Sequence, residues 1–297
     1  MESHASEQAV RSAARSPGRR SFIIFQALYN RPASALGTTL VIFFLALALL
    51  GSWIAPYEIN QQIPQDARQA PSISYWFGTD HLGRDVFSRV VLGAGQVLLL
   101  AGSGTMLAVV IGTSLGLLSG YQGGWLDDVF MRFFDSLLAI PALLLALLFL
   151  GMAGPSRQSV LLVIVIVYTP IVARVVRSVV LSVKIKSFID AARLQGESTF
   201  RILFREILPS AIPALAVEAS LRFSYAIFLV SSLGFLGLGV QPPNPDWGLM
   251  VKEARAFVSQ APWAMYFPAG AIAFIVIGVN LMADGLRRIL QISQENR

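Results

Sequence analysis

The sequence predicts an all-α membrane protein with six transmembrane helices and both termini in the cytoplasm. Hydrophobic residues make up 55% of the 297-residue chain and charged residues only 13%, about half the charged share of a soluble domain. Several stretches of about 20 residues carry almost no charge, and a helix of that length crosses the hydrocarbon core of a bilayer. Arginine and lysine gather in alternate connections between these stretches. The low charge also excludes disorder, a nucleic-acid-binding surface and an ordinary cytosolic enzyme.

Six stretches have the length of a membrane span. They are residues 35–55, 96–119, 136–153, 159–181, 211–235 and 264–286. The first three contain no charged residue, although the third contains Pro141. The fourth is apolar up to Arg174 and Arg177 near its end, and the sixth contains Asn280 and Asp284 near its end. An even number of spans places both termini on one side of the membrane.

The positions of the 23 Lys and Arg residues orient these spans. Sixteen lie in the N-terminal tail, in the connections after the second span and around the end of the fourth, or at the C-terminus, whereas six lie on the other side. Positive charge concentrates on the cytoplasmic side, so both termini face the cytoplasm. The predicted organisation is a basic tail (1–34), a first span with an extracytoplasmic segment (35–95), a core of five spans (96–286) and a second cytoplasmic tail (287–297).

The sequence gives the chain no energy source of its own. It contains no cysteine and two histidines, so we expect no metal site. None of its three lysines follows a glycine, so the G-x-x-x-x-G-K-[ST] phosphate-binding loop is absent. Glu218 is the one acid well inside a span, whereas ion-coupled carriers use several. We therefore expect a membrane component that binds no cofactor and whose energy source lies elsewhere.

The longest cytoplasmic connection, residues 182–210, reads as a helix–turn–helix elbow. Ser187 can cap the first helix, with Asp190 three residues later as in a capping box. Gly196 can end that helix in a left-handed conformation. A second apolar face then follows, formed by Phe200, Leu203, Phe204 and Ile207. Pro209 lies at the start of the fifth span, where its missing N–H costs little.

Six residues of this elbow follow one spacing: an acid and two alanines, three residues, a glycine, eleven residues and Leu-Pro. They are Asp190, Ala191, Ala192, Gly196, Leu208 and Pro209. The pattern resembles the "EAA" loop of the permease subunits of bacterial binding-protein-dependent ABC importers, with Asp190 where the family has Glu. In that family the elbow docks in a groove on the ATPase subunit. The resemblance implies that these six residues couple nucleotide-driven closure to the spans; an interfacial helix pair without a partner is the alternative.

Four further segments are similar to dipeptide, oligopeptide and nickel permeases of the second-subunit type. They are residues 77–89, 120–135, 235–248 and 280–287. The resemblance covers roughly residues 30–290 and implies the type I importer permease fold in a bacterial cytoplasmic (inner) membrane. It implies import of di- or oligopeptides, with nickel or another small solute as the alternative.

The resemblance also implies partners: a second homologous permease, two ATP-binding subunits that use ATP and Mg, and an extracytoplasmic solute-binding protein. The chain itself is then no enzyme; it contacts membrane lipid and binds no nucleic acid. The glycine- and proline-rich loop of residues 234–245 either contacts the binding protein or is a connector.

Two functions of other classes stay open. A self-sufficient secondary transporter would need helices broken at Pro141 or Pro170 with ion-coordinating acids beside them, and no acid accompanies either proline. An intramembrane hydrolase would use His81 with Asp80 or Asp85 and a serine from a neighbouring loop.

The segment before the second span reads as a short interfacial helix. Asp80 can cap a helix over 82–93. The polar side of this helix, with Arg84, Asp85 and Arg89, is expected to face water. Asp85 and Arg89 stand four residues apart, so we expect an exposed ion pair worth a few tenths of a kcal/mol. A contact with substrate or a receptor is the alternative.

The second span and the connection after it carry two further patterns. Gly112, Gly116 and Gly120 recur every four residues, which predicts a close helix–helix seam, either internal or with a second permease. Asp128 and Arg132 lie four residues apart in the next connection and are expected to pair.

The fifth span contains the one pair of opposite charges within a predicted span. Glu218 and Arg222 stand four residues apart. When two opposite charges lie one helical turn apart, each lowers the free-energy cost of placing the other in a bilayer. We expect them to pair and to face protein or the transport pathway. The pair either fixes the span against its neighbours or contacts the termini of the substrate.

Overall fold

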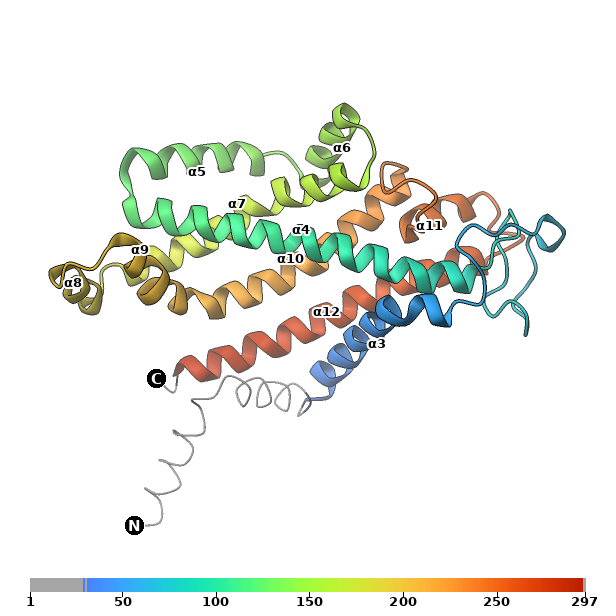
Figure 1. The fold of residues 1–297 in the computed structure, drawn as a ribbon, viewed down its shortest axis with the longest axis horizontal. Coiled ribbons are helices and arrows are strands. Elements are labelled where there is room, and N and C mark those ends of the chain that lie inside the picture. Colours follow the sequence, from blue (N-terminus) through green and yellow to red (C-terminus); the bar gives the residue numbers. More distant parts are fainter. Residues whose placement is uncertain (1–28, 30, 296–297) are drawn as a thin grey trace, which may run out of the picture.

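The computed structural model describes residues 29 and 31–295, a part of the chain in which all regular structure is helical. Five helical runs in this part are long and apolar enough to cross a membrane. They are α3 (Pro32–Ile54), α4 (Val86–Gln122), α7 (Arg157–Val183), the run of α9 (Thr199–Arg201), η2 (Ile202–Ile207) and α10 (Leu208–Leu236), and α12 (Trp263–Glu295). These runs form one elongated bundle (Figure 1).

The predicted third span, residues 136–153, is wrong as a single helix. The chain instead forms α5 (Gly124–Leu138) and α6 (Ala142–Ala153), which meet at 90° across a short break. Pro141 explains the break, because proline donates no N–H and keeps the preceding residue out of the helical conformation. Counted as one broken span, the pair brings the number of crossings to six.

The second span begins earlier than predicted. α4 has 37 residues and includes most of the segment expected to be a separate interfacial helix. Its N-cap is Asp85, whose carboxylate accepts the backbone N–H of Ser88 at 2.7 Å, so Asp80 is not the cap. At 1.5 Å per residue the helix is about 55 Å long, well beyond the ~30 Å of a hydrocarbon core.

The glycine seam of α4 lies within this chain, against α7. A Cβ atom at Gly112 would stand 2.8 Å from the carbonyl oxygen of Thr169, and one at Gly120 would stand 3.0 Å from Cβ of Val180. The close approach of the two backbones therefore requires glycine. A second seam, which no repeated glycine spacing predicts, joins α3 to α12, where a Cβ at Gly278 would stand 2.8 Å from Cβ of Leu40.

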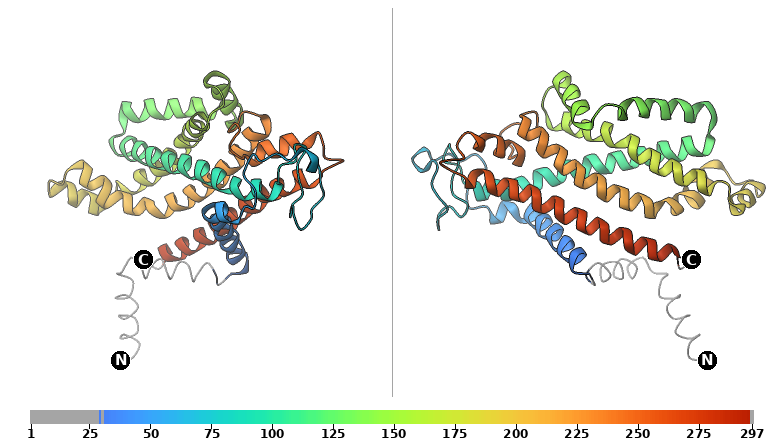
Figure 2. Two further views of the ribbon diagram at one scale, coloured as in Figure 1. Left: turned by 45° about the vertical axis from the view of Figure 1, so that its right-hand side comes forward. Right: turned by 180° about the vertical axis from the view of Figure 1, so that it is seen from behind.

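The two ends of the bundle carry different structures. The elbow, with α8 (Ser187–Leu194) and α9, lies at the end where α4 turns into α5, as Figure 1 and both views of Figure 2 show. Residues 55–85, with the short η1 (Pro64–Asp66), and α11 (Trp247–Arg255) lie at the opposite end. Most of the predicted basic tail, residues 1–34, lies outside the described residues, and the predicted C-terminal tail begins within α12.

Candidate functional site

The cytoplasmic elbow has the predicted turn. Gly196 follows α8 with φ of +74°, the left-handed conformation in which side chains with a Cβ are strained. Ser198 caps the next turn by accepting the N–H of Arg201. The predicted capping box at Ser187 is wrong, because Ser187 is the first residue of α8 and the N-cap is Lys186, which makes no side-chain cap.

Apolar side chains fix the elbow against the bundle. Ile189 of α8 is fully buried, in a cluster with Val176 and Val180 of α7 and with Leu203 and Ile207 of η2. The apolar face predicted for the second helix is therefore only half right: Leu203 and Ile207 are buried, whereas Phe200 and Phe204 are exposed.

Two polar contacts tie the elbow to the cytoplasmic end of α4. The Nζ of Lys184 donates to the carbonyl oxygen of Gly120 at 2.8 Å. The guanidinium of Arg193 lies 5.3 Å from the ring centroid of Tyr121 and also donates to its hydroxyl. The elbow, α7 and the end of α4 are thus one connected unit.

The outer surface of the elbow is apolar and open. Leu194 is 90% exposed, and Ile185, Phe188 and Phe200 are also exposed. Of the six residues of the predicted coupling motif, four are exposed, and Ala192 and Leu208 are half-buried. Exposed apolar clusters of this kind are typical of protein–protein contacts.

The charged pair of the fifth span is formed at mid-length of α10. The Nε atom of Arg222 lies 2.8 Å from Oε1 of Glu218, but the N–H does not point along this line, so the contact is an ion pair without a hydrogen bond. The guanidinium lies 4.8 Å from the ring centroid of Tyr225 and 5.6 Å from that of Tyr168. It reaches a cavity of about 380 Å³ between α6, α7 and α10.

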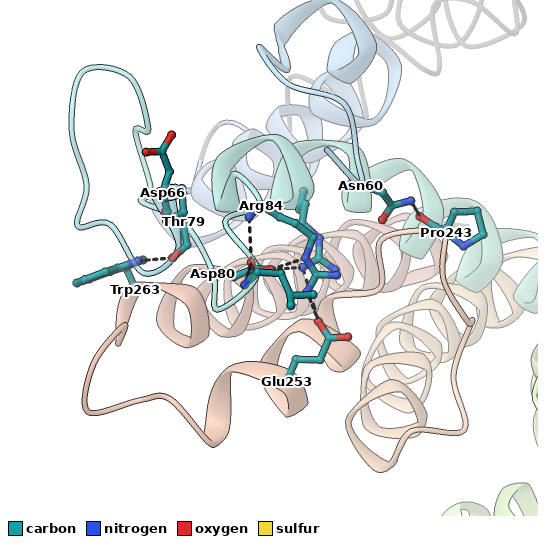
Figure 3. Close-up of polar contacts among 10 residues, drawn as sticks. Asn60, Asp66, Thr79, Asp80, Arg84, Pro243, Glu253 and Trp263 are labelled. Atoms are coloured by element: carbon teal, nitrogen blue, oxygen red, sulfur yellow. Dashed lines mark hydrogen bonds and ion pairs between the residues drawn. The ribbon is translucent and has the colours of Figure 1, made fainter. Parts of the chain in front are cut away.

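The opposite end of the bundle holds a network of buried charges, which Figure 3 shows. Oδ2 of Asp80 accepts two hydrogen bonds, one from Nε of Arg84 at 2.6 Å and one from Nη1 of Arg89 at 2.8 Å. Nη2 of Arg84 binds Glu253 of α11 at 2.6 Å. The predicted solvated helix and the exposed Asp85–Arg89 pair are therefore wrong: both arginines and both aspartates are buried, because α11 covers the segment.

Three further hydrogen bonds tie the external segment and the start of α4 to distant parts of the chain, two of them drawn in Figure 3. The indole of Trp263, at the start of α12, donates to Thr79 at 2.9 Å, and Asn60 donates to the carbonyl oxygen of Pro243 at 2.9 Å. The indole of Trp247 donates to the carbonyl oxygen of Val90 at 2.9 Å. Aromatic N–H groups in the sequence are a signal for such anchors, but they do not reveal their acceptors.

Burial shifts the acidity of groups in this region. It raises the pKa of Asp85, while the hydrogen bond from the backbone N–H of Ser88 opposes the shift. It raises the pKa of Asp246, the N-cap of α11, to about 6. The side chain of Asp246 accepts the N–H of Leu249 at 2.9 Å, and its Oδ2 is buried without a hydrogen-bond partner in the described part of the chain.

The connection after α4 pairs differently from the prediction. Asp127 binds the guanidinium of Arg177 through two contacts of 2.6 Å, so this bidentate pair joins α5 to α7. The predicted Asp128–Arg132 pair is not formed in the described structure, where Arg132 is exposed. Bidentate guanidinium–carboxylate geometry is the stronger arrangement.

The hydrolase alternative finds no support in the geometry. The ring of His81 stacks on Phe257 with centroids 4.7 Å apart, and its Nδ1 is buried without a partner among the described residues. Asp80, the neighbouring acid, is bound by two arginines.

Comparison with known proteins gives consistent matches. The family described as "Binding-protein-dependent transport system inner membrane component" matches residues 112–293, and the "N-terminal TM domain of oligopeptide transport permease C" matches residues 22–71. A dipeptide transport system permease of Alkalihalophilus pseudofirmus is 40% identical over 93% of this chain and 90% of its own length. A glutathione transport system permease of Escherichia coli (strain 536) is 42% identical over 84% of this chain and 83% of its own length.

The fold also has a solved counterpart. The MetNI methionine ABC transporter, in an inward-facing conformation, matches with a TM-score of 0.54 at 18% identity, over 69% of this chain and 95% of that one. At this identity the likeness concerns the fold. The chain belongs to the family of binding-protein-dependent transport system inner membrane components, the permeases of bacterial ABC importers, as the sequence analysis predicted.

Proposed function

We propose that this chain is a permease subunit through which di- or oligopeptides enter the cell across the cytoplasmic membrane. The observation that carries the proposal is the 40% identity to a dipeptide permease along almost the whole of both chains. The relatives named for glutathione, itself a small peptide, support the same substrate class. Nickel or another small solute is the competing substrate.

The proposed assembly supplies what this chain lacks. A second homologous permease completes the pathway, two ATP-binding subunits use ATP and Mg, and an extracytoplasmic binding protein delivers the solute. This chain binds no cofactor and hydrolyses nothing. Its exposed apolar helices contact membrane lipid where they do not contact the second permease.

The elbow couples the ATP-binding subunit to the spans in this proposal. The coupling residues are Asp190, Ala191, Ala192, Gly196, Leu208 and Pro209. The exposed apolar surface around Leu194 supports a docking role. The bonds of Lys184 and Arg193 to the end of α4 would carry a displacement of the elbow into the bundle.

Uptake measurements test the substrate class. A strain that lacks this gene should lose uptake of labelled dipeptides and recover it with the wild-type gene. Recovered uptake of nickel without any recovered peptide uptake would contradict the proposal. Uptake that persists without any ATP-binding subunit would indicate a secondary transporter instead.

A matched pair of surface variants tests the coupling role. Leu194→Glu places a charge on the elbow surface and should abolish co-purification of the ATP-binding subunit. Ile73→Glu places the same charge on a side chain that is 96% exposed at the opposite end and should leave co-purification unchanged. Equal behaviour of the two variants would remove the elbow from the interface.

A further inference from the structure

Arg222 places a charged side chain at a depth in the membrane where a charge is energetically unfavourable. It lies at mid-length of α10 and packs beside Tyr168, which lies near mid-length of α7. An ionised side chain at this depth is unfavourable and usually marks a pathway or a binding site. Its one ion pair among the described residues uses Nε, with Glu218. In the described structure Nη1 and Nη2 have no acceptor.

The cavity beside Arg222 has the size and composition of a small-molecule site. Its volume of about 380 Å³ falls in the range of ligand pockets, which are mostly apolar with a few polar groups. Apolar side chains of α6, α7 and α10 form most of the wall. The polar groups at the wall come from Arg222, Tyr168, Tyr225 and Ser232.

The break between α5 and α6 opens onto the same cavity. Ile140 and Pro141 line it, and both lie outside the helices. Non-helical backbone at membrane depth is tolerated only where protein covers it or where it lines a water-filled cavity. The break between the two helices, the guanidinium without acceptors and the cavity therefore lie together, although Pro141 and Arg222 are about 80 residues apart in the sequence.

We propose that this cavity binds the carboxylate terminus of a transported peptide, with Arg222 as the contact residue. The inference rests on the proposed peptide import. A guanidinium fork matches a carboxylate through two parallel hydrogen bonds, and Nη1 and Nη2 supply such donors. The rings of Tyr168 and Tyr225 lie beside the guanidinium, and the apolar walls accept the adjoining side chain.

Glu218 balances the charge of Arg222 when the cavity is empty. It does not line the cavity, so an incoming carboxylate does not meet it directly. The pair thus combines the two roles expected from the sequence. Glu218 lowers the free-energy cost of placing Arg222 at this depth, and Arg222 binds the carboxylate of the substrate.

Binding to the purified transporter tests the inference. The chain is isolated with the subunits that co-purify with it and placed in nanodiscs, and the soluble binding protein is left out. The probe is labelled Ala-Phe, and the competitors are unlabelled Ala-Phe and its C-terminal amide. We expect the free acid to compete at least about tenfold better than the amide, the loss typical of a missing charged hydrogen bond.

Three variants sharpen the test. In Arg222→Gln, affinity for Ala-Phe should fall about tenfold or more, and acid and amide should then compete equally. Arg157→Gln removes an exposed arginine at the start of α7, outside the cavity, and should bind as wild type. Glu218→Gln removes the competing carboxylate and should keep the preference for the free acid.

Several results would overturn the inference. Equal competition by acid and amide in the wild type would do so without any variant, even if Arg222→Gln does not fold. Loss of the second permease from purified Arg222→Gln would assign the guanidinium to a carboxylate of that subunit. If wild-type cells import Ala-Phe but the purified transporter shows no preference for the free acid, this site alone is refuted. If wild-type cells import no peptide, the proposed function is refuted as well.

Discussion

Arg84 and Glu253 are separated by 169 positions in the sequence, yet Nη2 of Arg84 lies 2.6 Å from Oε2 of Glu253. Together with Asp80 and Arg89 they form a network of two cations and two anions at the external end of the bundle. Such a network holds together only while every charge keeps a partner, because an unpaired buried charge is strongly unfavourable.

Asp80 should be the most sensitive member of this network. Asp80→Ala leaves two buried arginines with less compensation and should destabilise the protein by about 3–5 kcal/mol. Thermal unfolding of the detergent-solubilised protein measures the loss. Glu58→Gln removes an exposed carboxylate from the same segment and serves as the control. Equal unfolding temperatures for both variants would show that the network adds no stability.

Asp246 should make stability depend on pH. Burial raises its pKa from 3.8 to about 6, so the folded state keeps the proton up to about pH 6 while the unfolded state releases it near pH 4. Its contribution is therefore full below about pH 4 and is lost as the pH rises to about 6. Asp246→Asn keeps a capping oxygen and cannot ionise, so its stability should not fall between pH 4.5 and 7.5 as that of the wild type does. Parallel unfolding curves of variant and wild type between pH 4.5 and 7.5 would contradict this.

The seam between α4 and α7 should reject larger side chains. Gly112→Leu would force atoms against the carbonyl oxygen of Thr169, and overpacking of this kind costs about 1–3 kcal/mol. Gly151→Leu is the matched control, because a Cβ at Gly151 meets no atom of residues 31–295 within 4 Å. Thermal unfolding should separate the two variants, and the seam is loose if they unfold alike.

The turn at Gly196 should be needed for transport and not for insertion. Among the described residues a Cβ there meets nothing within 4 Å, so the positive φ is what opposes a substitution, by about 1–2 kcal/mol. Gly196→Val should abolish peptide uptake with normal amounts of protein in the membrane. Gly196→Asn, which tolerates this conformation, should transport. Normal uptake by the valine variant would show that the turn is dispensable.

Cysteine labelling should confirm the orientation, and the absence of native cysteine keeps the background clean. Ser72, Asn244 and Ser198 are exposed. Ser72 belongs to the segment 55–85 and Asn244 to the connection that leads into α11, at one end of the bundle, whereas Ser198 belongs to the elbow at the other end. Cysteines at 72 and 244 should react with an impermeant maleimide in intact cells, and a cysteine at 198 only after permeabilisation. Reaction at 198 in intact cells would reverse the predicted orientation.

Local signals in the sequence predict the spans and the elbow well. Apolar length marks five of the six crossings, and Gly196 and Pro209 mark the turn and the start of α10 correctly, because each acts through its own backbone. The ion pair of Glu218 and Arg222 follows from a spacing of four residues on one helix.

Long-range packing accounts for the failures. Arg84, Asp85 and Arg89 read as a solvated surface because their burial depends on α11, which lies some 160 residues away. Proline can either kink a helix or end it, so Pro141 alone does not predict the break before α6. The apolar length of residues 136–153 favours one continuous helix. Arg177 pairs with Asp127, which lies 50 positions away in the sequence. No helical spacing in the sequence predicts an ion pair over that separation.

The length of α4 has a mechanical consequence. Its cytoplasmic end contacts Lys184 and Arg193 of the elbow region, and its external end carries Arg89 of the charge network. A straight rod of about 55 Å that tilts by 5° about its centre moves each end by about 2.4 Å, in opposite directions. That displacement approaches the length of a hydrogen bond, so the rod works as a lever. Any rocking of the elbow must strain the contacts of Asp80 on the far side of the membrane, unless the external segment moves with the rod.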